Sequence, residues 1–130
     1  MKTDFFTTGS GSTTPSTSPL IYTSQINQVG LSAPTEVVLE NTLGLTLSWT
    51  RHNIGTFKAT ISPAVDWTKT SFYVGNQMVS SGGVSGSPSK LINTIENSST
   101  EITIETMELL TGSSFDDMLQ NTLLELKYYA

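Results

Sequence analysis

The sequence predicts an all-β protein: an antiparallel β-sandwich or jelly-roll-like domain with one short helical turn and a flexible N-terminal arm. Three observations lead to this prediction. Short runs rich in β-branched and aromatic residues recur from residue 20 onward, and Gly, Pro, Asn or Asp bound them. In the clearest runs, apolar and polar residues alternate with a period of two. The chain has 130 residues and no cysteine, which suits one domain with a modest core and no disulfides.

Residues 1–19 are expected to form the arm, and residues 20–130 the sandwich domain. From Thr7 to Pro19 every residue is Gly, Ser, Thr or Pro, a composition that cannot bury enough surface to offset the entropy of ordering. Phe5 and Phe6 precede this stretch. Two interpretations stay open: a disordered start or artificial linker with incidental aromatics, or a tether whose apolar hook orders when it docks on a partner.

The first half of the domain is expected to contain four strands. Leu45, Leu47 and Trp49 alternate with polar residues, so that the large side chains share one sheet face. The strand that follows alternates in the same way, and residues 51–55 are expected to close a hairpin between the two. Gly44 marks a turn before the first of this pair. The four expected strands are 20–26, 35–41, 45–51 and 56–62.

The second half is expected to contain four more strands and the helical turn. The strand at 100–109 has the clearest alternation, and the strand at 71–79 is expected to carry a bulge at Gly75. Ser113 or Ser114 can cap a helical turn within 112–121, whose positive N-terminal end suits Asp116 and Asp117. The remaining segments are a loop at 80–89, a weaker strand at 90–97 and a last strand at 122–130, with Leu124, Leu126 and Tyr128 on one face.

The charge pattern argues against nucleic acid as a partner. The net charge is −5, and the six basic residues are scattered singly, whereas phosphate binding needs a cluster of Lys and Arg. The sequence has no apolar run of signal-peptide length and none of the ~18 residues that a membrane span needs. We therefore expect a protein made in the cytoplasm without an export signal and without a membrane span.

Catalytic and metal-binding signals are missing from the sequence. His52 is the only histidine, it falls in the expected hairpin loop, and no serine lies in a G-x-S-x-G motif. Glu101 and Glu105 share the parity of a solvent-facing strand side, and Asp116-Asp117 lacks the spaced ligands of a calcium loop. We expect no catalytic residue, no metal, no cofactor and no enzymatic activity.

Aromatic residues provide the candidate ligand site. Aromatic faces can stack on sugar rings. The candidate ligand-binding residues are Trp67, in an expected loop after residues 62–66 (SPAVD), and Tyr73. Trp49 alternates with core leucines and is expected to be buried instead.

A set of positions in fixed order carries a family resemblance. The set comprises Tyr22, Gln28, Gly30, Ala33-Pro34, the run 38–44 (VLENTLG), Trp49, Arg51, Gly55, Ala59 and Thr60, followed by Ile102, Ile104, Gly112, Asp116-Asp117, Leu119, Asn121-Thr122, Glu125 and Tyr128. In this order they resemble a domain of bacteriophage virion structural proteins, particularly of phages that infect Bacteroidetes. The resemblance spans residues 20–129 and excludes the arm. Phe57 departs from it, since the family more often has Tyr there.

The resemblance implies a non-enzymatic virion component: a capsid decoration, a head fibre, or a tail-fibre or baseplate part. It implies a location in the virion and partners among other virion proteins, such as capsid, portal or tail proteins, with a host-surface glycan as a further candidate. Exposed edge strands favour a homo-oligomer, and the fibre analogy favours a trimer. Phe5 and Phe6 are then candidate virion anchors. The alternative is a carbohydrate-binding or adhesin module.

Three residues of the set receive local structural roles. Asn41 and Gly44 are expected to hold the bend after the second strand, with the Asn side chain bonded to nearby backbone. Arg51 is expected to pair with Glu40, if their strands are antiparallel neighbours.

Overall fold

The computed structural model describes residues 18–75, 90–108 and 112–130. Most of the expected arm, with Phe5 and Phe6, and the whole of the expected loop at 80–89 lie outside these residues. Within them the chain forms eight strands: β1 (Leu20–Asn27), β2 (Thr35–Asn41), β3 (Thr46–Asn53), β4 (Thr56–Ser62), β5 (Thr70–Val74), β6 (Lys90–Ser98), β7 (Glu101–Glu108) and β8 (Thr122–Tyr128).

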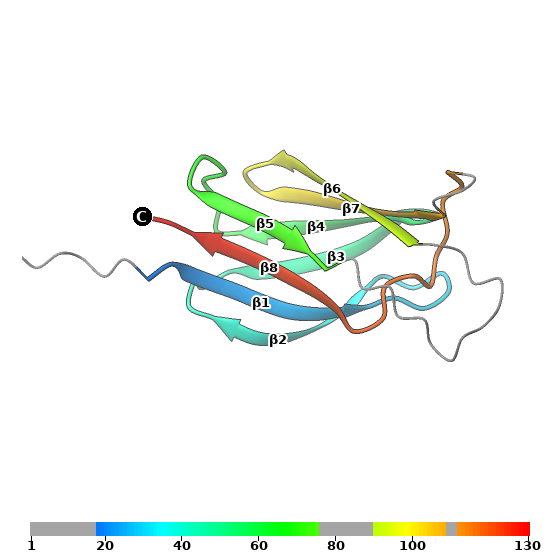
Figure 1. Cartoon of the computed structure of the whole chain (residues 1–130), viewed down its shortest axis with the longest axis horizontal. Helices are drawn as coiled ribbons and strands as arrows, with labels where there is room; N and C mark the ends of the chain where they lie inside the picture. Colours follow the sequence, from blue (N-terminus) through cyan, green and yellow to red (C-terminus); the bar gives the residue numbers. More distant parts are fainter. Residues whose placement is uncertain (1–17, 76–89, 109–111) are drawn as a thin grey trace, which may run out of the picture.

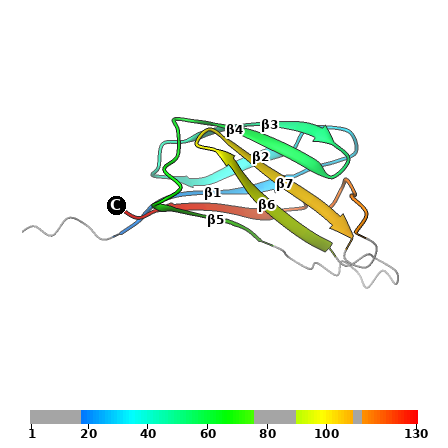
Figure 2. The same cartoon turned by 90° about the horizontal axis from the view of Figure 1, so that it is seen from above.

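The strands form two four-stranded antiparallel sheets that pack face to face (Figures 1 and 2). Sheet A has the order β2-β1-β8-β5, and sheet B has the order β3-β4-β7-β6. Hairpins join β1 to β2, β3 to β4 and β6 to β7, while the other connections cross between the sheets. The predicted β-sandwich is confirmed. Both the start of β1 and the C-terminus lie at one end of it (Figure 1).

The period-two alternation places the core between the sheets. In sheet B, Ala59 opposes Ile102 and Phe57 opposes Ile104, and all four side chains are buried. In sheet A, Leu124 and Leu126 of β8 are buried beside inward-facing residues of β1 and β5. The buried apolar cluster contains Tyr22, Ile26, Leu45, Phe57, Ala59, Ile61, Val65, Val74, Ile102, Ile104, Leu119, Leu124 and Leu126.

Trp49 lies at the margin of this core. It faces inward with Leu47 and packs against the buried cluster, but it keeps partial exposure because β3 is the edge strand of sheet B. Its indole Nε1 is buried without a hydrogen-bond partner among the described residues. Core packing by Trp49 is therefore confirmed, although its burial is incomplete.

The bend between β2 and β3 has the predicted chemistry. Asn41 Nδ2 donates to the carbonyl oxygen of Leu45 at 2.8 Å, and Leu45 N donates to Asn41 Oδ1 at 3.0 Å. Gly44 between them has φ +72°, a left-handed conformation that favours glycine. The Asn41 side chain thus holds the two ends of the turn that carries the chain from sheet A to sheet B.

The predicted helical turn at 112–121 is wrong, since no helix forms among the described residues of that segment. Instead, the chain turns back along β7: Ser114 bridges Met107, and Phe115 N donates to Thr106 O at 3.1 Å. Thr106 Oγ1 donates to Phe115 O at 2.6 Å. These bonds occupy backbone groups of the segment. Contacts with β7, the preceding strand, therefore override the local preference for a helix cap.

Candidate functional site

Arg51, on the inward face of β3, binds the segment that leads into β8. Its Nε and Nη2 donate to the two carboxylate oxygens of Asp116 at 3.2 and 2.7 Å, which is a bidentate ion pair. Gly55 N, in the β3–β4 hairpin, donates to Asp116 Oδ1 at 2.9 Å. The hydrogen bond from Arg51 is the main cause that lowers the pKa of Asp116, and the Gly55 bond adds to it.

The expected pairing of Arg51 with Glu40 is wrong. Glu40 lies on β2 in sheet A and opposes Thr23, whereas Arg51 lies on β3 in sheet B. The strands follow one another in the chain but belong to different sheets, so the two side chains are not cross-strand neighbours.

A second group of bonds fixes the neighbouring loops. Gln28 is buried after β1; its Oε1 accepts from Asp117 N at 2.8 Å, and its Nε2 donates to Gly30 O and Ser32 O at 2.8 and 2.9 Å. Asp117 Oδ1 accepts from Gly30 N at 2.6 Å. Asn121 N donates to Asn27 Oδ1 at 2.8 Å. The side-chain amide of Gln28 therefore joins the β1–β2 loop to the segment before β8.

These contacts explain why so many residues of the resemblance are polar or glycine. Gln28, Gly30, Arg51, Gly55 and Asp116-Asp117, far apart in the sequence, join the β1–β2 loop, the β3–β4 hairpin and the segment before β8. Each polar group bonds to another member of the set or to nearby backbone. We therefore assign these residues a structural role.

His52 is exposed on β3, one residue before the end of the strand rather than in the hairpin loop where it was expected. Across the ranges 18–75, 90–108 and 112–130, no group of three or more His, Asp or Glu side chains is placed to hold a metal ion. The same part of the chain contains no helix with the length and hydropathy of a membrane span.

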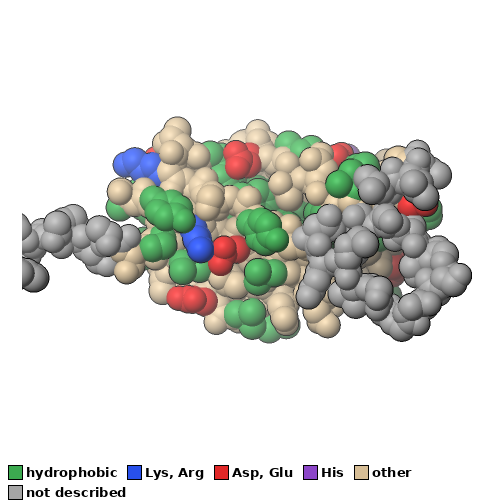
Figure 3. All heavy atoms as spheres, in the orientation of Figure 1, with side chains coloured by type: hydrophobic (Ala, Val, Ile, Leu, Met, Phe, Trp, Pro, Cys, Tyr) green, Lys and Arg blue, Asp and Glu red, His purple; other side chains and the backbone are tan. Residues whose placement is uncertain are grey.

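The structure does not bring Trp67 and Tyr73 together. Trp67 lies in the β4–β5 connection, where its ring packs against inward-facing Phe72 at a centroid distance of 6.0 Å and its Nε1 donates to Ser98 O at 2.7 Å. Tyr73, the next residue on β5, points outward and is 56% exposed. Tyr73 lies on the outer face of sheet A opposite Glu125, where apolar and charged side chains are mixed (Figure 3).

The edge strand β2 is exposed on both faces. Val37, Val38 and Leu39 are 58%, 48% and 56% exposed. Val37 opposes Gln25 on the outer face and Val38 opposes the buried Ser24 on the inner face, while Leu39 is the extra residue at a register shift. β2 contains no lysine, arginine or proline, and the features that oppose pairing along it are its two glutamates, Glu36 and Glu40, and the register shift at Leu39.

A polar cluster lies beside Val38 on the inner face. Ser24 Oγ donates to Glu36 Oε2 at 2.6 Å, so the Glu36 carboxylate already has a partner within the sheet. Burial, and then the contact with Glu36, raise the pKa of the Tyr22 phenol. The one acidic side chain on the inner face of β2 is therefore held by its own sheet.

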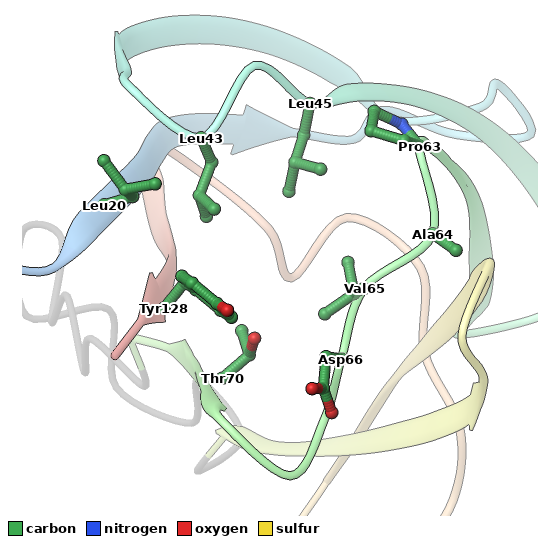
Figure 4. Close-up of a pocket in the computed structure, with 9 residues that line it drawn as sticks. All are labelled: Leu20, Leu43, Leu45, Pro63, Ala64, Val65, Asp66, Thr70 and Tyr128. Atoms are coloured by element: carbon green, nitrogen blue, oxygen red, sulfur yellow. The ribbon is translucent and has the colours of Figure 1, made fainter. Parts of the chain in front are cut away.

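A pocket of about 280 Å³ opens at the end of the sandwich where β1 begins and β8 ends. Its lining comes from two of the crossovers between the sheets, β2–β3 and β4–β5, and from the ends of β1, β5 and β8. Leu43, Leu45, Val65 and Tyr128 point toward one another across it (Figure 4). We refer to it below as the end pocket.

Comparisons of the chain with models of protein families, with curated proteins and with solved structures found no match. The candidate sites therefore depend on this structure and on the sequence.

Two of these features were not expected from the sequence. The run Val37-Val38-Leu39 interrupts the period-two pattern, and this interruption was a usable signal for a strand with both faces exposed. The end pocket had no such signal, because its lining residues come from five separate stretches of the chain that only the sheet topology brings together.

Proposed function

We propose that this chain is a non-enzymatic structural component of a bacteriophage virion that assembles with copies of itself through β2. The observation that carries the proposal is the uncovered edge of β2. Three consecutive apolar side chains are exposed there on a strand with a free edge, and an edge strand that exposes apolar side chains is suited to pair with another chain.

The acidic side chains of β2 are compatible with a second copy as the partner. Glu36 accepts a hydrogen bond from Ser24, which reduces the electrostatic cost of placing the Glu36 carboxylate near another acidic strand. An antiparallel pair centred on Val37 places Glu36 opposite Val38 and avoids two glutamates facing each other. Pairing would extend sheet A across the two-fold axis. This pairing uses the β2 edge of both copies and gives a dimer, so a trimer, which the fibre analogy favours, would need another contact and stays a prediction. Anchoring through Phe5 and Phe6, which lie outside the described residues, also stays a prediction.

The virion assignment draws its support from the resemblance. Its polar members form the bonds that join the β1–β2 loop, the β3–β4 hairpin and the segment before β8, so the pattern describes a way of building this sandwich. A capsid decoration, a head fibre, and a tail-fibre or baseplate part all remain within the proposal. Mass spectrometry of purified particles tests it, and absence of the chain from intact particles that infect normally would contradict it.

Assembly through β2 is tested with Val38→Lys in the full chain. We expect the wild type to sediment as an oligomer and the variant as a monomer, because a lysine on an edge strand opposes strand pairing. The matched control is Thr60→Lys, which adds the same charge at an exposed position of the central strand β4 and should leave the oligomer intact. A monomeric wild type, or equal oligomers in all three proteins, would contradict assembly through β2.

Glycan binding is the second candidate, and the exposure of Tyr73 on the outer face of sheet A favours it. A glycan array compares the wild type with Tyr73→Ala. Trp67→Ala is a poorer probe, because the Trp67 ring packs on Phe72 and its removal would disturb the fold. Binding that Tyr73→Ala abolishes would support the adhesin alternative, and no binding by the wild type would argue against it.

A further inference from the structure

The end pocket is apolar and incompletely covered. Leu45 and Val65 are buried, Leu43 is half-buried, and Leu20 is exposed to a large extent. The rest of the lining consists of Pro63, Ala64, Asp66, Thr70 and the Tyr128 ring. The pocket therefore offers apolar surface to an occupant and polar groups at its margin, a combination typical of binding pockets.

The volume of the end pocket matches aromatic rings. A dry apolar cavity of about 150 Å³ is enough to bind one benzene molecule. The end pocket, at about 280 Å³, has room for one phenyl ring with space to spare and comes close to what two rings need.

The chain itself supplies two such rings in the segment that precedes Leu20. The N-terminal arm enters the domain at Leu20, which lines the pocket. From Thr7 to Pro19 the arm holds only Gly, Ser, Thr and Pro, and the first aromatic residues before that stretch are Phe6 and Phe5. A Gly/Ser-rich random coil of this length has a typical end-to-end distance of roughly 20 Å. Since the tether starts at the pocket, its far end can return there at a high effective concentration.

The margin of the pocket carries one carboxylate, and residues 1–6 carry one charge of each sign, Lys2 and Asp4. The backbone and side chain of Thr68 both donate to Asp66 Oδ1, at 3.0 and 2.6 Å. These bonds from Thr68 are the main cause that lowers the pKa of Asp66, so the carboxylate is ionised at neutral pH. Lys2, the only basic side chain in residues 1–19, lies three residues before Phe5.

We propose that Phe5 and Phe6 of the chain's own N-terminal arm occupy the end pocket in the free protein. The aromatic pair covers Leu20 and Leu43, and Lys2 comes within reach of Asp66. Anchoring on a particle through the same pair then requires its release from the pocket. This inference goes beyond the proposed virion role and does not depend on it.

The test uses the full chain and its methyl NMR spectrum. Phenyl rings shift the resonances of nearby methyl groups, so the double variant Phe5→Ala/Phe6→Ala should move those of Leu20, Leu43, Leu45 and Val65. The methyl groups of Val37 and Val38 on β2 serve as internal controls and should not move. Phe115→Ala, which removes an exposed ring elsewhere, should leave the pocket resonances unchanged. Identical pocket resonances in the wild type and the double variant would overturn the proposal.

A peptide of residues 1–12 provides the reverse experiment. Added to the double variant, it should move the pocket resonances toward their wild-type positions and reach saturation, whereas the same peptide with both Phe replaced by Ala should not. The wild-type positions should also be independent of protein concentration. If they shift toward those of the double variant on dilution, while sedimentation shows oligomers dissociating, the arm occupies another copy and the intramolecular proposal fails. A virion that contains the chain would leave the proposed function standing in that case.

Discussion

Gly55 provides the sharpest test of the packing at the β3–β4 hairpin. Its φ is +64°, and a Cβ at this position would lie 2.5 Å from Thr106 O and 2.9 Å from both Phe115 N and Phe115 O. Thr106 N donates to Gly55 O at 2.8 Å, and Phe115 N donates to Thr106 O at 3.1 Å. Gly55→Ala must therefore strain the backbone and displace the segment around Phe115 as well.

The expected loss of stability follows from these two effects. A left-handed conformation costs a non-glycine residue roughly 1–2 kcal/mol. Weakening the two backbone hydrogen bonds costs about 1 kcal/mol each, so Gly55→Ala should lower the free energy of unfolding by about 3 to 4 kcal/mol. Urea unfolding followed by tryptophan fluorescence measures this loss, at one fixed protein concentration because assembly would add to stability.

Gly44→Ala is the matched control. Gly44 has φ +72°, but a Cβ there would meet nothing within 4 Å. The free energy of unfolding of Gly44→Ala should therefore fall only by the cost of the left-handed backbone, roughly 1–2 kcal/mol. The difference between the two variants, about 2 kcal/mol, measures the close approach of Phe115 and Thr106. Equal losses in the two variants would refute the packing described for Gly55.

Two further predictions concern Trp49 and Asp116. Trp49→Ala should lower the free energy of unfolding by about 2–3 kcal/mol, below the 3–5 of a fully buried Trp, because the ring keeps partial exposure; an unchanged urea midpoint would contradict its packing role. The native pKa of Asp116 is lowered, so its contribution is present at neutral pH and is lost as pH falls below about 4. Acidification should thus destabilise the wild type more than Asp116→Asn, and parallel pH profiles would contradict the ion pair.

The parts of the fold that could be predicted from the sequence depend on local pattern. Phe57, Ala59 and Ile61 share one face because side chains alternate along any extended strand, whatever lies elsewhere in the chain. The two hydrogen bonds between Asn41 and Leu45 join residues only four positions apart, so they could also be predicted from local sequence. Both predictions are confirmed for these reasons.

The failed predictions depend on contacts between distant segments. The capping signals near Ser113 are real local preferences, but Phe115 bonds to Thr106, and Asp116 bonds to Arg51, 65 residues away in the sequence. Arg51 was assigned to Glu40 because the two strands are consecutive. The β2–β3 connection carries the chain to the other sheet, which separates them. Sequence alone does not say which connections pass from one sheet to the other.

The distribution of polar and apolar side chains supports binding as the basis of the proposed function. The polar residues that resemble a functional motif, such as Gln28, Arg51 and Asp116, have their bonding groups turned toward other parts of the same domain. The apolar side chains that the fold leaves uncovered include those of β2 at one edge and of the end pocket at one end. Buried hydrogen bonds fix the shape of the two sheets, and uncovered apolar surface gains free energy when a partner covers it. The proposed pairing through β2 would cover part of this apolar surface, while the buried hydrogen bonds would keep the two sheets in place as the copies associate.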